Sequence, residues 1–343
     1  MIVNPSKVTI TMNIEKINWN GLDAVLLETN VYEAIIIPSI GANLVKLYNK
    51  EKKVDILRTP NSEDMKTFMS RPQVFGVPLL FPPNRIEDGK YTFAGKNYKF
   101  PITIPDQNNY HHGIIKSEPF TITRTRISFD AVEVEASFFS NRVNHAIYDN
   151  FPHEFACRIR FILTDQELTH IITFTNLGTK PMPLGMGYHT PLRLPFSKNT
   201  DKSDYKLRLS VGKRWELSDR SLPTGNLLDL NEEETLLRNV GINPTGKPIE
   251  IALTDQEIQV NGKPFHGAIL TNTKDKISVY YEVDSKFKHW TLWNNGGEVD
   301  WVCPEPQTWA INAPNLKLPA DITGLQALNG GKSWSGTTRF YVR

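Results

Sequence analysis

The sequence predicts an all-β protein, built as one large antiparallel sandwich or barrel. Apolar and polar residues alternate with a period of two in many short runs, and turn-forming residues separate these runs. The 343 residues include 23 prolines and 21 glycines, too many chain breakers for a helical bundle. Helical periodicity is scarce: only Asn61–Met69 and Asp321–Leu328 could form a turn or two, and loops are favoured there.

The clearest alternation predicts a hairpin with arms Arg158–Thr164 and Leu168–Thr175, joined by a turn at Asp165 and Gln166. One face of its second arm is expected to carry Leu168, His170, Ile172 and Phe174. The segment Thr121–Phe139 repeats this pattern, with Val132 and Val134 alternating against Glu133 and Glu135. In chain order, the other expected strands are Ala24–Glu28, Tyr91–Phe93, Lys206–Val211, Ile277–Val283, Trp290–Trp293 and Thr337–Val342.

The connecting segments suggest one structural unit. Thr190–Asp204, with two prolines and several loop-forming residues, is expected to be a long surface loop. The string LTDQE occurs at Leu163–Glu167 and at Leu253–Glu257, which we interpret as one hairpin turn used twice. No Pro/Gly/Ser linker divides the chain, so a single domain over residues 1–343 is expected.

The composition excludes several classes of function. The chain has 39 basic and 37 acidic side chains without a long basic block, which argues against a nucleic-acid binder. Proline interrupts the longest apolar stretches well short of a membrane span, and the first 23 residues contain no continuous apolar signal core. Cys157 and Cys303 alone define no disulfide or metal framework. We therefore expect a cytoplasmic monomer or homodimer with neither a membrane nor a nucleic-acid partner.

Common cofactor motifs are missing. The dinucleotide pattern G-x-G-x-x-G and the nucleophile elbow G-x-S-x-G are absent, and Gly331-Lys332-Ser333 lacks the first glycine of a phosphate loop. Nicotinamide, acyl-transfer and nucleotide chemistry thus lose their usual sequence support. We expect no cofactor and no metal.

Two polar segments stand out in the first third of the chain. Asn84 and Arg85 follow an apolar run stiffened by three prolines, and the arginine either clamps a ligand or ties loop carbonyls together. His111 and His112 precede Gly113, which permits close backbone approach at a ligand rim. Adjacent histidines on a strand face opposite sides, so at most one is expected in a pocket. A surface hydrogen-bonding role is the alternative.

Two later residues have constrained surroundings. His189 lies at an expected strand end, between glycines and Pro191, and an imidazole suits proton transfer near neutral pH. A half-buried structural histidine is the alternative. Glu305 stands between Pro304 and Pro306 after an apolar strand, and prolines restrict the backbone on both sides. A general base needs such a fixed position before substrate binds, whereas a turn glutamate is the alternative.

Taken in order, these segments resemble the aldose 1-epimerase (galactose mutarotase) family. Asn84-Arg85-Ile86 is similar to the family's sugar-binding arginine motif, and His112-Gly113 to its histidine–glycine element. His189-Thr190-Pro191 is similar to its second histidine motif, and Cys303 to Gln307 with Asn315 to its glutamate motif. The resemblance covers roughly residues 20 to 340.

The resemblance implies a galactose-mutarotase-like β-supersandwich of large antiparallel sheets, with the site in an open cleft. It implies interconversion of the α and β anomers of a free aldose such as galactose or glucose. In this scheme Glu305 is the general base at the anomeric hydroxyl O1, and His189 is the general acid at the ring oxygen O5. His112 binds near O5, while Asn84 and Arg85 hold the sugar. Ring opening and re-closure need only an acid and a base, so no metal or cofactor is implied.

Other assignments have alternatives. Asp255 best matches the family's substrate-binding aspartate, but it lies in the second LTDQE segment, where a turn role is equally consistent. Trp290, Trp293 and Trp309 are candidates for an aromatic platform under the sugar, and core packing is the alternative for each.

The chain also departs from the family pattern. Ile114 stands where a second glycine is common, and Thr190-Pro191 where an aromatic pair is common. These departures leave open a carbohydrate-binding protein without turnover. A glycoside hydrolase or lyase would need a second carboxylate at a defined distance from Glu305, for which Asp255 is the obvious partner.

Overall fold

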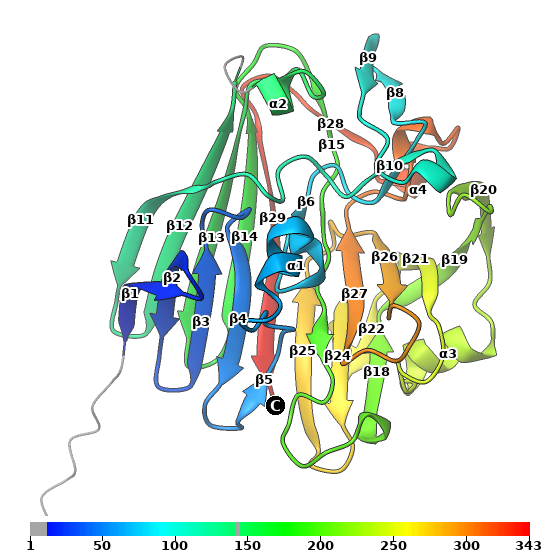
Figure 1. The fold of residues 1–343 in the computed structure, drawn as a ribbon. Helices are drawn as coiled ribbons and strands as arrows, with labels where there is room; N and C mark the ends of the chain where they lie inside the picture. Colours follow the sequence, from blue (N-terminus) through cyan, green and yellow to red (C-terminus); the bar gives the residue numbers. More distant parts are fainter. Residues whose placement is uncertain (1–11, 142–144) are drawn as a thin grey trace, which may run out of the picture.

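The structure is a computed structural model that describes residues 12–141 and 145–343 (Figure 1). Strands dominate, and every strand pairing within these ranges is antiparallel. The prediction of an all-β protein with large antiparallel sheets is therefore confirmed. The expectations about the start of the chain and about one domain over 1–343 also cover residues 1–11 and 142–144, which lie outside the described ranges.

One of two eight-stranded sheets in the described ranges is called the long sheet below. In spatial order its strands are β11 (Thr121–Ile127), β12 (Ala131–Ser140), β13 (Phe155–Thr164), β14 (Leu168–Asn176), β29 (Ser333–Val342), β25 (Ile277–Val283), β24 (Gly267–Asn272) and β18 (Tyr205–Leu209). The predicted hairpin is confirmed as β13–β14. Buried and half-exposed residues alternate along the whole of β14, so the four residues expected on one face are buried together.

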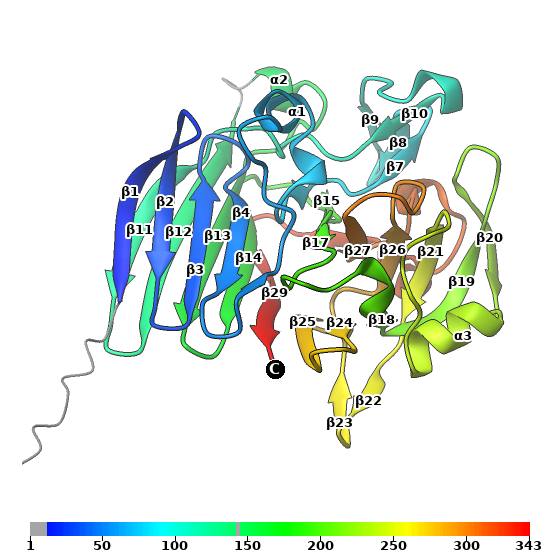
Figure 2. The same cartoon turned by 60° about the horizontal axis from the view of Figure 1, so that its bottom comes forward.

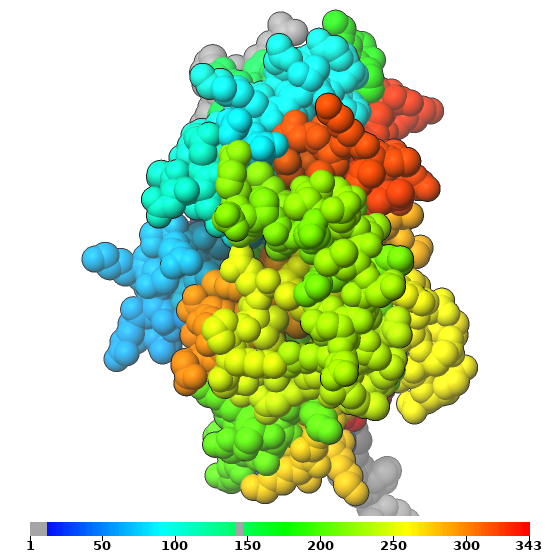
Figure 3. Space-filling view, turned by 90° about the vertical axis from the view of Figure 1, so that its right-hand side faces the viewer, coloured from blue at the N-terminus to red at the C-terminus, as the bar shows by residue number. Residues whose placement is uncertain are grey.

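A second sheet carries the candidate site and is called the site sheet. Its strands, in spatial order, are β20 (Pro223–Leu228), β19 (Val211–Leu217), β21 (Glu250–Asp255), β26 (His289–Trp293), β27 (Trp301–Gln307), β16 (Gly187–Tyr188) and β6 (Leu79–Leu80), and β17 (Leu192–Arg193) also pairs with β27. Seen from the side of this sheet, the yellow-green chain through β19, β20 and α3 (Glu232–Asn239) forms the middle of the surface (Figure 3).

A five-stranded sheet covers one half of the long sheet (Figure 2). Its strands run in sequence order: β1 (Asn13–Trp19), β2 (Leu22–Glu28), β3 (Tyr32–Ile37), β4 (Asn43–Asn49) and β5 (Val54–Asp55). Strands β1, β2 and β3 contact β11, β12 and β13, respectively. At the other half, Trp290 of the site sheet meets Tyr281 of β25 edge-on, with ring centroids 6.5 Å apart. One continuous apolar core runs through all three sheets.

Short two-stranded pairs and helices complete the structure. The paired short strands are β7 (Arg85–Glu87) with β10 (Asn109–His111), β8 (Lys90–Phe93) with β9 (Lys96–Lys99), β15 (Met182–Leu184) with β28 (Gln326–Leu328), and β22 (Ile258–Val260) with β23 (Lys263–Phe265). The other helices are α1 (Met65–Ser70), α2 (His145–Tyr148), α4 (Ala320–Thr323) and the 3-10 turns η1 (Pro72–Val74), η2 (Pro105–Gln107), η3 (Lys202–Asp204) and η4 (Ala313–Asn315). Over residues 12–141 and 145–343, none of the helices has the length and hydropathy that crossing a membrane requires.

The helices correct part of the sequence analysis. α1 and α4 form where loops were favoured, and α3 was not anticipated at all. The signal for α3 is nevertheless present in the sequence, because Asn231 and Glu234 form a reciprocal capping box at its start. Local capping chemistry therefore outweighed the weak apolar periodicity.

Two further expectations are wrong in part. Thr190–Asp204 is not a surface loop throughout, because most residues up to Ser197 are buried and β17 lies within this stretch. The second LTDQE copy is not a hairpin turn like the first, which connects β13 and β14. Its first three residues end β21, and the chain continues into β22, which pairs with β23 rather than with β21. Identical letters thus adopt different structures because their strand partners differ.

Candidate functional site

The site is built around a gap in the pairing of β27. This strand pairs with β26 without interruption from Cys303 to Gln307, whereas on its other side β16 and β17 pair only with its two ends. Between these ends lie Pro304 and Pro306, and proline has no N–H to offer a hydrogen-bonded ladder. The prolines that constrain Glu305 therefore also open the sheet beside it.

The register across this gap places His189 opposite Glu305. Gly187 pairs with Gln307 and Leu192 with Val302, so the same antiparallel register, continued between them, matches residue 189 with residue 305. Residues directly opposite each other in such a register point to the same face of a sheet. Two residues 116 positions apart thus meet because short strands on both sides of the gap fix their alignment.

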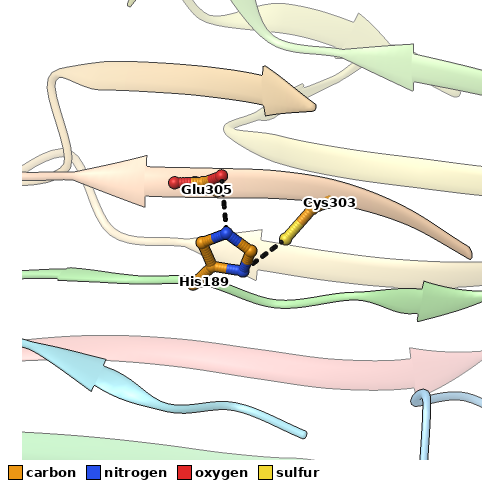
Figure 4. Close-up of side chains that lie close together, drawn as sticks. All are labelled: His189, Cys303 and Glu305. Atoms are coloured by element: carbon orange, nitrogen blue, oxygen red, sulfur yellow. Dashed lines mark hydrogen bonds and ion pairs between the residues drawn. The ribbon is translucent and has the colours of Figure 1, made fainter. Parts of the chain in front are cut away.

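His189 contacts two side chains of β27 (Figure 4). Its Nε2 lies 3.2 Å from Oε1 of Glu305, and its Nδ1 lies 3.0 Å from Sγ of Cys303. All three residues are at most 2% exposed. Cys303 and Glu305 are two positions apart on one strand, so their side chains share a face.

Burial controls the ionisation of this pair. It raises the pKa of Glu305 well above its usual value, while the Arg85 guanidinium opposes this rise and the Glu250 carboxylate adds to it. Burial also lowers the pKa of His189 to about 3. One proton on the pair is therefore held by Glu305 beside a neutral imidazole. Moving that proton across the 3.2 Å contact gives a carboxylate and an imidazolium without changing the total charge.

A cavity of about 250 Å³ opens onto this pair. Its lining residues come from segments far apart in the sequence: Arg71, Gln73, Val74, Asn84, Arg85, His111, His112, His189, Glu250, Thr291, Trp293 and Glu305. Strand register explains three of them, because Thr291 pairs with Glu305, and Trp293 pairs both with Cys303 and with Glu250. These side chains therefore share one face of the site sheet.

Both histidines of the His111–His112 pair line the cavity, so the expectation that at most one would do so is wrong. β10 ends at His111, and His112 has a left-handed backbone with φ of 66°, which breaks the alternation of a strand. Their rings stack with centroids 3.3 Å apart, and the His112 ring meets that of His189 edge-on at 5.0 Å. Burial lowers the pKa of both well below the usual value, so both are neutral at neutral pH.

Gly113 holds this loop against the neighbouring strand. Its φ is +76°, and a Cβ at this position would lie 2.5 Å from the backbone nitrogen of Phe81. The Ile114 N–H donates to the carbonyl of Phe81 at 2.8 Å. The close backbone approach expected at Gly113 is thus made to the backbone of Phe81.

Asn84 and Arg85 are fixed by side chains on three different elements. Asn84 donates to the Thr291 hydroxyl at 3.1 Å and accepts from the Arg85 side chain at 3.3 Å. Arg85 donates to Gln107 and to Glu250, each at 3.0 Å, and its side chain is 11% exposed. The guanidinium thus lines the cavity in a fixed orientation.

Asp255 does not line the cavity. It is five positions from Glu250 on β21, an odd number, so its side chain lies on the opposite face of the site sheet. There its carboxylate accepts from Ser210 at 2.6 Å and from Trp290 at 3.0 Å, and it contacts His266 Nδ1 at 2.5 Å. Asp255 is therefore not brought together with Glu305 as a pair of carboxylates.

Of the three candidate tryptophans, only Trp293 reaches the cavity, where it meets His189 edge-on with centroids 5.4 Å apart. Trp290 and Trp309 are each 1% exposed and pack in the core. The sequence reasoning missed Arg71, Gln73, Val74, Glu250 and Thr291 as lining residues. Glu250 and Thr291 follow from strand register once Glu305 is chosen, whereas the Arg71–Val74 segment carries no distinctive motif.

His189, Cys303 and Glu305 are the one group of described residues whose ligand-type atoms could hold a metal ion, since these atoms lie within 4.8 Å of one another. The two nitrogens of the imidazole, however, face different partners. A single ion on either nitrogen would face only one of those partners, so the arrangement suits proton transfer better than chelation.

Comparisons with known proteins identify the family of this chain. The aldose 1-epimerase family profile matches residues 23–341. Galactose mutarotase of Bos taurus is 22% identical over 214 residues, 62% of this chain and 57% of that protein, so the chain spans little more than half of it. Galactose mutarotase of Mus musculus is 21% identical over 81% of each chain.

Solved structures show the same fold. A galactose mutarotase-like protein of Clostridium acetobutylicum has a TM-score of 0.94 and 36% identity, covering 97% of this chain and 98% of that one. Galactose 1-epimerase of Lactobacillus acidophilus has a TM-score of 0.71 at 15% identity, covering 98% and 99%. Because the family profile covers nearly the whole chain, this protein belongs to the aldose 1-epimerase family.

Proposed function

We propose that this protein is an active aldose 1-epimerase that interconverts the α and β anomers of a free aldose such as galactose or glucose. The observation that carries the proposal is the 3.2 Å contact between His189 Nε2 and Glu305 Oε1 at the wall of a small polar cavity. The two oxygens that exchange protons during ring opening, O1 and O5, are bonded to the same carbon. An acid and a base in contact suit two such neighbouring atoms.

The proposed reaction uses one proton on the pair. Glu305, as carboxylate, takes the proton from the O1 hydroxyl, and His189, as imidazolium, gives its proton to O5. The C1–O5 bond breaks as the C1=O1 double bond forms, which leaves the pair with one proton again. Rotation about C1–C2 and re-closure, with the proton transfers reversed, give the other anomer.

The binding groups around the pair support a sugar ligand. Arg85 and Asn84 offer donors to hydroxyl oxygens, and the two neutral histidines at 111 and 112 offer both donors and acceptors. In this proposal His112 binds near O5, with its buried Nδ1 lacking a hydrogen-bond partner among the described residues. The volume of about 250 Å³ is below the range of about 300–1,000 Å³ for drug-sized ligands, which favours a monosaccharide.

The test is a panel of pure anomers followed by polarimetry or one-dimensional NMR, corrected for buffer-catalysed exchange. We expect the wild type to accelerate exchange of at least one free hexose and Glu305→Gln to lower kcat about 10²- to 10⁴-fold. If no sugar exchanges faster but calorimetry detects binding, the protein is a carbohydrate-binding relative without turnover. If Glu305→Gln matches the wild type, the assigned base is wrong.

A further inference from the structure

Cys303 occupies an unusual position for a cysteine outside any disulfide. It is one of the two cysteines of the chain, it is fully buried, and its sulfur lies 3.0 Å from Nδ1 of His189. Together with Glu305 it leaves neither nitrogen of this imidazole without a protein partner (Figure 4). The function proposed above uses Glu305 and His189 and gives Cys303 no role.

The direction of the two contacts can be derived from the proton inventory. Glu305 in its protonated form donates to Nε2, so a neutral imidazole then carries its hydrogen on Nδ1. When His189 acts as an acid, the imidazolium also carries a hydrogen on Nδ1. Nδ1–H therefore persists in both forms, and the group that faces it must accept a hydrogen bond throughout.

A thiol suits this task better than a stronger acceptor would. Burial raises the pKa of Cys303 well above its usual value, so the sulfur stays a neutral thiol and a weak acceptor. A carboxylate in the same position would stabilise the imidazolium and weaken it as an acid. A neutral sulfur orients the ring without holding the proton.

We propose that Cys303 is a positioning residue of this site, whose thiol accepts the Nδ1–H of His189 and confines proton exchange to Nε2. This role rests on the function proposed above for its effect on rate, but not for its effect on the tautomer. The hydrogen bond at one imidazole nitrogen determines which nitrogen carries the proton. For metal-binding histidines, loss of such a partner costs about 10- to 100-fold in metal affinity or activity, and we take the lower end of this range for His189.

The first measurement is made on the free protein by long-range ¹H–¹⁵N NMR of the histidine ring. His189 signals are identified by their loss in His189→Gln. We expect Nδ1 to be protonated and Nε2 bare in the wild type and in Cys303→Ser, whose hydroxyl also accepts. In Cys303→Ala we expect a mixture that includes the Nε2-protonated form. Cys157→Ala, which alters the other buried cysteine, on β13, should leave the wild-type spectrum unchanged.

The second measurement is the pH dependence of kcat and KM. Cys303→Ala should lower kcat about tenfold, leave KM within about twofold and shift the acid limb of the profile. Cys303→Ser should recover most of the rate, while Cys157→Ala keeps the wild-type profile. If Cys303→Ala does not fold, the serine variant and the wild-type tautomer decide the matter.

Nε2–H in the wild type, or a Cys303→Ala variant with the wild-type tautomer and pH profile, would overturn the role of Cys303. A wild type that exchanges no anomers, yet shows Nδ1–H lost in Cys303→Ala, would instead overturn only the proposed function.

Discussion

The β13–β14 hairpin of the long sheet and the strand β27 of the site sheet form an instructive contrast. Along β14, buried and half-exposed residues alternate without a break, whereas all seven residues of β27 are buried. The hairpin pairs residue by residue over its full length, but β27 carries two prolines and is paired only at its ends on one side. Regular pairing stabilises the fold, and interrupted pairing leaves side chains free to meet across a gap.

Each region contains a buried histidine, and the two differ in their partners. His170 on β14 stacks on Phe161 with centroids 4.7 Å apart, and neither of its ring nitrogens has a hydrogen-bond partner among the described residues. His189 has a partner on each nitrogen. Burial lowers the pKa of both histidines to about 3. A shifted pKa alone therefore does not distinguish the two histidines; the contact with Glu305 at a cavity is what supports the proposed role of His189.

The largest expected effect comes from replacing each of these histidines with glutamine. His189→Gln removes the proposed acid and should lower kcat about 10²- to 10⁴-fold with a small change in stability. His170→Gln should keep kcat within about twofold but lower the free energy of unfolding by about 1–3 kcal/mol, because it buries an unsatisfied amide. Polarimetry and chemical denaturation measure both. Equal losses of kcat would abolish the distinction between the two regions.

The second effect separates two arginines that each contact a glutamate. Arg85→Lys replaces a fork that contacts Glu250, Gln107 and Asn84, and should raise KM about tenfold or more. Arg339→Lys alters the Arg339–Glu282 pair of the long sheet, which is partly exposed, and should leave KM unchanged. Initial rates over a range of sugar concentration provide the comparison. A KM for Arg85→Lys equal to that of Arg339→Lys would remove Arg85 from the binding site.

The third effect concerns the two faces of the site sheet itself. Asp255→Asn replaces a carboxylate that contacts Ser210, Trp290 and His266 with a neutral amide. We expect it to lower the free energy of unfolding by about 1–3 kcal/mol. Because this residue lies on the face away from the cavity, kcat and KM should stay within about twofold. A large rise of KM without loss of stability would return Asp255 to the substrate-binding residues.

The smallest effect is the pH dependence of stability. The pKa of Glu305 is raised in the folded protein, so the folded chain keeps a proton that the unfolded chain loses above about pH 4.5. Stability from this group is complete below that pH and is lost as pH rises toward the folded pKa, by roughly 1 kcal/mol per pH unit. We therefore expect the Tm of the wild type to fall relative to that of Glu305→Gln as the pH rises from 6.5 to 9. His189 does not affect this pH range. Its lowered pKa contributes to the free energy of unfolding above about pH 6.5, and that contribution is lost only as the pH falls from there toward 3. A difference in Tm that is constant over this range would contradict the raised pKa.

Much of the fold was predictable because its signal is local. Alternation identified the β13–β14 hairpin and β25 with nearly correct ends, since one buried face imposes a period of two on each strand. α3 has poor apolar periodicity, so its only local signal is the capping box at Asn231 and Glu234. The prolines on both sides of Glu305 predict a constrained backbone. In the structure the same prolines also open the sheet beside this residue.

The site was predictable only as a set of residue types. Asn84, Arg85, His112, His189 and Glu305 line one cavity, and their roles toward a sugar stay predictions. The position of Asp255 on the face away from the cavity and the entry of His111 into the cavity could not be predicted from the sequence. The face on which Asp255 lies depends on strand ends known to within one residue. The entry of His111 depends on the left-handed backbone of His112.

The sequence by itself determined the all-β class, the main strands and the segments rich in chemistry, because hydrophobic alternation and proline constraints act between near neighbours. Only the tertiary structure decided that His189 lies between Glu305 and Cys303. That meeting depends on the register of β16 and β17 against β27, and register is fixed by pairings between residues more than a hundred positions apart.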